Sequence, residues 1–429
     1  MGMTKVRKAL IKDFLSTSAA GFCSLALCLS ARGDDSATSA AFHSAQDILD
    51  CVLKRHPDIQ RSNADISVVK ASEISARQIP NPGFNSRTLL ATSSSDNDIL
   101  SEINIAQPIE LGGKRDSRIA KALADQELSF SAVNAVKEEV VIQTVLALNR
   151  LRQLRLEMDE LEETLSIYER IREQFKNRSI LSPEQRASLS VFRTAAQATA
   201  LHKITLMDEE GRLKVFLEKA TGRGIEITQE ILPKPITHWP NFPSEPKNAE
   251  FGGAKMKRAV AELSTAAAAY RLAKSEAWPN VELGPSIEPD SVGGKVSTSF
   301  GFNMAVPLPL YHQNQGQVEE ALRAQKRAQL NVELTQSELE KERSSLVERY
   351  DQNLKAVGKA KLVWDAEEER GEKDLESLFQ NGVVPASLMI EANRQSFDLL
   401  QSLNAAELRA IEELWRLYAL EGWIFDEKI

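Results

Sequence analysis

Two stretches of the chain alternate between apolar and polar side chains with a period of two residues, the pattern of a strand with one apolar face. In residues 99–109 isoleucine recurs on one face, and in residues 296–308 phenylalanine and methionine do so. The apolar positions are Ile103, Ile105 and Ile109 in the first stretch and Phe300, Phe302, Met304 and Val306 in the second. Polar or small residues lie between them, so each stretch predicts a half-apolar strand.

Each of these strands has a predicted partner across a polar loop. Residues 83–92 precede the first loop, "TSSSDND", and residues 280–287 precede the second, "EPDSVGGK". Polar runs of this kind do not pack and indicate hairpin turns. The sequence therefore predicts two β-hairpins, separated by long helical segments.

A very long helix follows each hairpin. Residues 115–175 contain neither proline nor glycine, and apolar side chains recur there on a heptad seam. At 1.5 Å per residue this rod is about 90 Å long. A matching rod spans 315–379, and shorter helices at 183–219 and 385–420 return from the two rods. The seam residues are Leu151, Leu154, Met158, Leu161, Leu165, Tyr168 and Phe175.

Two further helices are predicted at 45–79 and 255–277. We expect 255–277 to extend the return helix at 183–219, and 45–79 to extend the one at 385–420, so that each sum matches a rod. Residues 221–254 hold five prolines and several glycines. This composition predicts an irregular equatorial segment.

The chain carries this plan twice. Pro80-Asn81 and Pro279-Asn280 are 199 residues apart, and so are Pro108 and Pro307. Repetition of this size indicates an internally duplicated protein. The expected divisions are repeat 1 (32–220, with strands at 83–92 and 99–109 and a helical hairpin at 113–219), the equatorial segment (221–254), and repeat 2 (255–429, with strands at 280–287 and 296–308 and a helical hairpin at 312–420).

Four such strands admit two interpretations. They have the length and alternation of transmembrane β-strands, whose apolar side chains face lipid. Alternatively, they form a small soluble sheet that caps a helical bundle. The long helices, matched in length between the repeats, favour the membrane barrel.

The N-terminal residues 1–31 have the layout of a secretory signal peptide, with basic residues before a mostly apolar run. Within this segment, Cys28 is an alternative lipidation site. The net charge is −8 at pH 7, and an acidic exported protein is a poor candidate for nucleic-acid binding. After the signal segment Cys51 stands alone, so no intrachain disulfide is expected.

No constellation of residues predicts catalysis, a cofactor or a metal site. The five histidines are scattered, without partners at metal-ligand spacing. Gly112-Gly113 is not followed by the Lys-Ser/Thr pair of a phosphate-binding loop. We expect these glycines to bend a strand into a helix, and we expect the chain not to be an enzyme.

Together these features resemble the TolC-like outer-membrane factor family over essentially the whole mature chain. The most specific segment is "QPIELGGKRDSR" at 107–118, which is similar to the barrel exit in the heavy-metal (CzcC-like) efflux branch. The segment "VPLPLYHQNQGQVEEA" at 306–321 and the stretch "FQNGVVPASLMIEANRQSFDLLQS" also fit the family pattern.

The resemblance implies a mainly α protein with a transmembrane β-barrel. It implies a homotrimer that shares a twelve-stranded barrel, surrounded by lipid, in the outer membrane of a Gram-negative bacterium, with an α-helical tunnel in the periplasm. The implied activity is passive export, and the closest branch suggests heavy-metal ions. The implied partners are a periplasmic membrane-fusion adaptor and an inner-membrane pump of the resistance-nodulation-division type. A periplasmic coiled-coil adaptor or scaffold without a barrel is the alternative.

The resemblance also implies roles for individual residues. Glu391 is expected either to join a ring of carboxylates that faces the lumen or to be an ordinary solvated helix residue. The periplasmic tip turns are expected at Phe175, Pro183, Phe379, Gly382 and Pro385. The transition from barrel to tunnel is expected at Pro108, Gly112, Gly113, Pro307 and Pro309.

Overall fold

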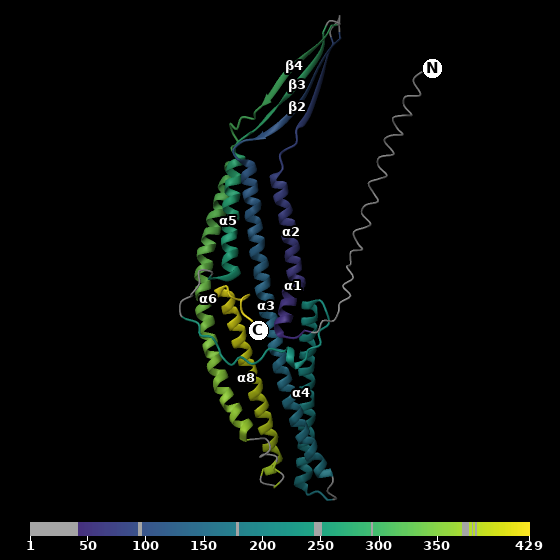
Figure 1. Cartoon of the computed structure of the whole chain (residues 1–429), viewed down its shortest axis with the longest axis vertical. Helices are drawn as coiled ribbons and strands as arrows, with labels where there is room; N and C mark the ends of the chain where they lie inside the picture. The colour runs from purple at the N-terminus through teal and green to yellow at the C-terminus, as the bar shows by residue number, and fades with distance from the viewer. Residues whose placement is uncertain are drawn as a thin grey trace, which may run out of the picture. The chain divides into compact units, whose positions relative to one another are not determined.

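The computed structural model describes residues 42–92, 97–176, 180–243, 251–292, 295–370, 377–379, 381 and 384–429. Residues 43–429 form one unit, which is described by itself (Figure 1). The expected signal segment and Cys28 lie outside the described residues, so both remain expectations.

The four strands form one antiparallel sheet in the order β1-β2-β3-β4. The strands are β1 (Gly83–Thr92), β2 (Asn97–Glu110), β3 (Asn280–Val292) and β4 (Lys295–Ala305). The expected end of the third strand at 287 is wrong, because residues 288–292 pair with β4 instead of forming a loop. The fourth strand ends at Ala305 rather than at 308, since Pro307 and Pro309 have no N–H to donate to a ladder.

The helical part of the unit consists mainly of long helices. They are α1 (Ala45–Arg55), α2 (Pro57–Arg77), α3 (Lys114–Lys176), α4 (Pro183–Thr221), α5 (Gly253–Glu276), α6 (Gln315–Arg370) and α8 (Ala386–Glu421), with a 3-10 helix at Gln229–Ile231. The equatorial segment was expected to continue to 254, but α5 already begins at Gly253.

The single helix expected at 45–79 is in fact two helices. Pro57 lacks the N–H that would continue α1, so the first helix ends before it. His56 joins the two: its N–H donates to the Val52 carbonyl over 2.8 Å, and its Nδ1 accepts the Asp58 N–H over 3.2 Å. His56 therefore closes α1 and caps α2.

Shorter helices pack against the two long rods, α3 and α6 (Figure 1). On the side of the sheet, α2 packs on α3, and α5 packs on both rods. On the other side, α4 packs on α3, and α8 packs on both rods. Each half of the helical region is therefore one layer of four helices.

The expected pairing of the shorter helices is wrong. α5 meets the end of α8, where the Gly252 N–H donates to the Leu420 carbonyl over 2.7 Å. α1 meets the end of α4, where Cys51 Sγ lies 3.9 Å from the Thr221 carbonyl oxygen. Each return helix is thus continued by a helix of its own repeat, α4 by α1 and α8 by α5. The reason is that the helix before each hairpin packs on the rod that follows the same hairpin, α2 on α3 and α5 on α6.

The two helical layers meet at a waist with an aromatic core. Trp239 and Phe242 of the equatorial segment pack against Tyr350, with ring centroids 6.2 Å and 5.7 Å away. The Tyr350 hydroxyl donates to the Pro240 carbonyl over 2.9 Å. These contacts hold the irregular residues 222–243 against the rods.

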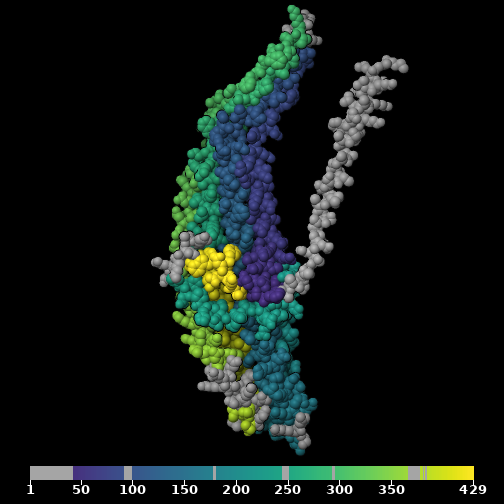
Figure 2. All heavy atoms as spheres, viewed as in Figure 1, coloured from purple at the N-terminus to yellow at the C-terminus, as the bar shows by residue number. Residues whose placement is uncertain are grey.

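The C-terminal end of the chain is also bound at the waist. Figure 2 shows it (yellow) beside α1 (purple), where the Ile429 N–H donates to Gln46 Oε1 over 3.2 Å. Arg343 and Glu421 form an ion pair of 2.7 Å, with side chains 3% and 2% exposed. Loss of one partner would leave a buried charge, so this pair fixes the end of α8 to α6.

Candidate functional site

One face of the sheet, here called the apolar face, is exposed although its side chains are large. Phe300 is 81% exposed and Ile103 is 38% exposed. Ile287 lies opposite both of them on the neighbouring strands, so the surface is continuous across three strands. The same face carries Phe84, Leu90, Ile99, Ile105, Ile109, Val296, Phe302 and Met304. An exposed apolar surface of this kind marks a membrane or protein contact.

The opposite face, here called the polar face, is more crowded. Asn104 and Ser286 are 8% and 5% exposed, and Asn85 donates to Asn104 Oδ1 over 3.1 Å. A Cβ at Gly284 would clash with the Ile105 carbonyl oxygen, so β2 and β3 approach closely only because Gly284 has no side chain. The charged members of this face are Arg87, Asp98, Glu102, Glu110, Glu282, Glu288, Asp290 and Lys295.

β1 and β4 form the edges of the sheet, and each pairs on one side only within the described part of the chain. An edge strand exposes a row of unpaired N–H and C=O groups. In lipid such groups need partners, which is why membrane-spanning sheets close on themselves. An exposed apolar face with two open edges is therefore the pattern of a sheet that further strands can extend.

Two glycines turn the chain from β2 into α3. Gly112 and Gly113 have φ angles of 71° and 70°, a conformation that residues with side chains rarely adopt. The Trp278 ring lies so close to Gly112 that a Cβ there would come within 2.4 Å of it. Of the other expected transition residues, Pro108 lies within β2, and Pro307 and Pro309 lie in the segment that follows β4.

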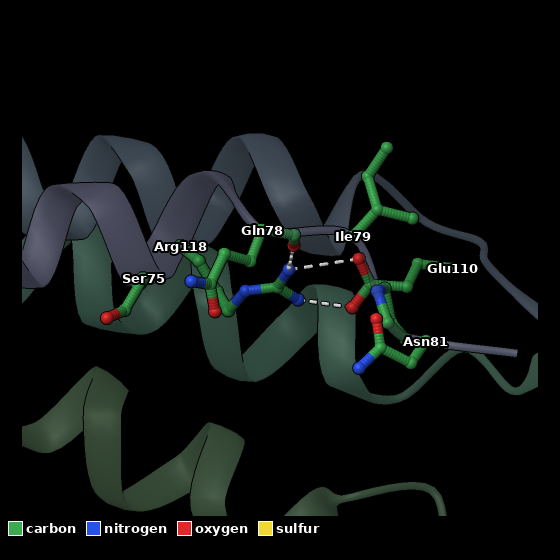
Figure 3. A pocket seen from close by; sticks show the side chains of 7 residues that line it. Ser75, Gln78, Ile79, Asn81, Glu110 and Arg118 are labelled. Atoms are coloured by element: carbon green, nitrogen blue, oxygen red, sulfur yellow. Dashed lines mark hydrogen bonds and ion pairs between the residues drawn. The ribbon is translucent and has the colours of Figure 1, made fainter. Parts of the chain in front are cut away.

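A cavity of about 620 Å³, here called the junction pocket, lies where α2, β2 and α3 meet (Figure 3). It is lined by Ser75, Gln78, Ile79, Pro80, Asn81, Glu110 and Arg118. The Arg118 guanidinium binds Glu110 through both carboxylate oxygens and donates to the Gln78 carbonyl over 3.3 Å. The charges in the pocket are thus mutually compensated.

The far end of the helices, opposite the sheet, brings together aromatic residues of both repeats. Phe379 packs against Phe175 and Phe192, with ring centroids 6.3 Å and 5.2 Å away. Pro183 is the first residue of α4, and Pro385 immediately precedes α8. Gly382 lies outside the described residues.

Glu391 lies near this end, on the second turn of α8, and its side chain is 46% exposed. It accepts hydrogen bonds from Arg394 over 3.1 Å and from Gln395 over 2.9 Å. The hydrogen bond from Gln395 contributes most, and the one from Arg394 next, to lowering the pKa of Glu391. The carboxyl group is therefore ionised at neutral pH. The side chain is therefore a hydrated carboxylate with a cationic neighbour on its own helix.

A polar network between α3, α4 and α8 was missed from the sequence. Glu157, whose side chain is 0% exposed, pairs with Arg150 over 2.7 Å and accepts from Asn404 Nδ2 over 2.9 Å. Arg150 also pairs with Glu209 over 2.8 Å. The heptad seam predicted only apolar contacts beside Met158. A buried glutamate or arginine on such a helix cannot be distinguished by sequence from a glutamate or arginine that faces solvent.

None of the described helices combines the length and apolar composition that crossing a membrane requires. In the same residues, three or more His, Cys, Asp or Glu side chains are nowhere grouped in a way that would bind a metal ion.

Residues 48–179 match the model of the family described as outer membrane efflux protein. No curated protein matches the sequence of the chain.

Solved structures of outer-membrane channels have a similar fold. The channel OprN has a TM-score of 0.70 at 12% identity, over 88% of this chain and 89% of that one. The open-state channel MtrE of Neisseria gonorrhoeae has a TM-score of 0.67 at 17% identity, over 90% of each chain. CusC has a TM-score of 0.68 at 15% identity, over 89% of this chain and 93% of that one. The chain thus shares with these channels a mainly helical fold with four antiparallel strands, and its residues 48–179 are similar to the outer membrane efflux protein family.

Proposed function

We propose that the chain is the outer-membrane channel of a tripartite efflux system. Three copies close a twelve-stranded barrel in the membrane, and their helices continue it as a tunnel into the periplasm. A periplasmic adaptor and an inner-membrane pump, of the resistance-nodulation-division type, supply the substrate and the energy. The channel itself performs no chemistry.

The observation that carries this proposal is the sheet. Its apolar face is exposed on both hairpins, its polar face is crowded with small and charged residues, and its two edges are open. A soluble adaptor, the alternative function, would have to leave Phe300 and Phe302 in water, at 81% and 68% exposure. Lipid outside and water inside satisfy both faces at once.

Membrane fractionation tests the proposal. We expect the native protein in the outer-membrane fraction, as a trimer that resists SDS until it is heated. A soluble periplasmic monomer would contradict the channel and favour the adaptor. Disruption of the gene should also lower resistance to exported compounds, and a copy supplied in trans should restore it.

For the substrate we propose heavy-metal cations. The support is the resemblance of residues 107–118 to the metal-efflux branch, together with Glu391, whose carboxylate would form a ring of three in a trimer. A strain without the channel should lose tolerance to metal salts while its tolerance to dyes and antibiotics is unchanged. The reverse result would assign the channel to organic compounds and leave the efflux function intact.

A further inference from the structure

We infer that the seam between neighbouring copies repeats the β2–β3 pairing within one chain, so that β4 of one copy pairs with β1 of the next in a register fixed by the internal duplication. This inference rests on the proposed barrel of several copies. It goes beyond that proposal because it specifies which residues of two copies meet.

The first step is the equivalence of the two hairpins. Pro80 and Pro108 recur as Pro279 and Pro307, each 199 residues later. The strand registers obey the same offset: Gly83 lies opposite Ala106, and Glu282 lies opposite Ala305. The outer edge of β4 is therefore the counterpart of the β2 edge that meets β3, and the outer edge of β1 is the counterpart of the β3 edge that meets β2.

The second step transfers the internal register to the seam. Within the chain, Asn104 lies opposite Ser286 and Ile103 lies opposite Ile287. Adding 199 to a residue number in β2 gives its counterpart in β4, and subtracting 199 from a residue number in β3 gives its counterpart in β1. The pair Asn104 and Ser286 thereby becomes Asn303 of one copy opposite Arg87 of the next. The pair Ile103 and Ile287 likewise becomes Phe302 opposite Thr88 of the next copy.

This register keeps the two faces of the sheet intact across the seam. Asn303 and Arg87 both belong to the polar face, and Phe302 and Thr88 both lie on the opposite one. A slip by one residue would bring apolar side chains onto the polar face. The transferred register is thus consistent with one apolar outer surface around a closed barrel.

Side-chain sizes at the end of the seam also fit. Within the chain, the large Trp278 lies on Gly112, which has no room for a side chain. The seam counterpart of Trp278 is Ile79, which is 66% exposed in the single chain. The seam counterpart of Gly112 is the exposed Gln313, which directly precedes Asn314 as Gly112 directly precedes Gly113. The seam therefore has a smaller side chain, Ile79, opposite a residue with a side chain, where the chain itself has the large Trp278 on a glycine.

The junction pocket lies at this position. Its rim includes Ile79 and Asn81, on the side of the sheet where β1 is the open edge. Within the chain, Lys114 Nζ donates to Asn280 Oδ1. The seam counterparts are Gln315, the first residue of α6 as Lys114 is of α3, and Asn81, whose amides are able to form the same hydrogen bond. The segment after β4 of one copy would therefore cover the rim of the junction pocket of the next.

Cysteine crosslinking in the full chain tests the register, in a Cys51→Ser background. The test variant carries Asn303→Cys with Arg87→Cys. Two matched variants move the second cysteine by two residues on the same face, to Asn85→Cys or Leu89→Cys. The internal counterpart, Asn104→Cys with Ser286→Cys, reports on the same geometry within one chain.

We expect Asn303→Cys with Arg87→Cys to give disulfide-linked dimers and trimers on non-reducing gels, several-fold more efficiently than either shifted pair. The internal pair should oxidise without any increase in mass. Preferential crosslinking of a shifted pair, or of no seam pair in a protein that still forms the heat-sensitive trimer, would overturn the register but not the channel. A protein with unmodified strands that forms no oligomer in the membrane would overturn both.

Discussion

Gly113 and Asn314 occupy the same structural position in the two repeats. Each directly precedes a long rod and has a positive φ, 70° for Gly113 and 58° for Asn314. Each carbonyl accepts the first helical hydrogen bond, from Ser117 N–H over 2.9 Å and from Val318 N–H over 3.0 Å. The strand-to-helix turn is therefore built with glycine in one repeat and with asparagine, which also tolerates this conformation, in the other.

This relationship predicts that alanine is unfavourable at both positions. Gly113→Ala should cost about 1–2 kcal/mol of stability, because a side chain is strained at this φ. Asn314→Gly should relieve backbone strain but lose the hydrogen bond from Asn314 Nδ2 to the Ala273 carbonyl, 2.9 Å long, worth about 1 kcal/mol. Asn314→Ala should be worse than Asn314→Gly. Thermal dissociation of the purified oligomer measures these effects, and an Asn314→Ala variant as stable as Asn314→Gly, or an unaffected Gly113→Ala variant, would contradict the prediction.

A second prediction separates the two faces of the sheet. Phe300→Arg should cost roughly 2–4 kcal/mol of membrane stability if this side chain lies near the bilayer midplane. Ser299→Arg should be tolerated, since Ser299 is on the polar face opposite Glu288. The amount of each variant assembled in the outer membrane is the measurement. Equal assembly of both would show that the apolar face does not contact lipid.

The alternation at Phe300 and Phe302 was sufficient to predict the sheet because a period of two is a local signal. The turn at Asn314 was missed for the opposite reason: at the offset of 199 it aligns with Arg115, and only the observed backbone aligns it with Gly113. The buried Glu157 was also missed, because its burial depends on α4 and α8, which are distant in sequence. Local periodicity reveals strands and rods, whereas helix order and polar networks depend on tertiary packing.

The third prediction concerns pH. Burial raises the pKa of Glu138 to about 7, although the Ala254 N–H donates to it over 3.0 Å and Lys257 and Lys255 act in the opposite direction. The folded state thus binds this proton more tightly than the unfolded chain. Its contribution is fully present below the unfolded pKa and is lost as the pH rises to about 7, by at most about 3 kcal/mol.

Melting temperatures between pH 4.5 and pH 7.5 test this sign. The natural protein should lose stability over this interval, and Glu138→Gln should reduce the loss. The neighbouring Glu139, exposed and bonded to Gln143, provides the control Glu139→Gln, which should leave the slope unchanged. Equal slopes for the natural protein and Glu138→Gln would rule out this carboxyl as the cause.

The fourth prediction concerns the buried network. Arg150→Met removes the guanidinium from Glu157 and leaves a buried carboxylate, a change that typically costs about 3–5 kcal/mol. The exposed pair of Lys203 with Glu162, 2.9 Å apart, is the comparison, and Glu162→Gln should cost less than about 1 kcal/mol. Denaturant unfolding of both variants gives the two values. Similar small losses would mean that water hydrates Glu157 in the assembled protein.

The last prediction tests whether Glu391 faces the lumen. In a trimer three such carboxylates would give a negative potential in a narrow passage and favour cations. Glu391→Gln should then lower the cation-to-anion permeability ratio in planar bilayers. Arg394→Gln should raise it, because this residue pairs with Glu391 over 3.1 Å and offsets its charge. Both effects should shrink in high salt, since the Debye length falls from about 10 Å at 0.1 M to about 3 Å at 1 M. Unchanged ratios for both variants at low salt would place Glu391 on the outer, solvated face of α8.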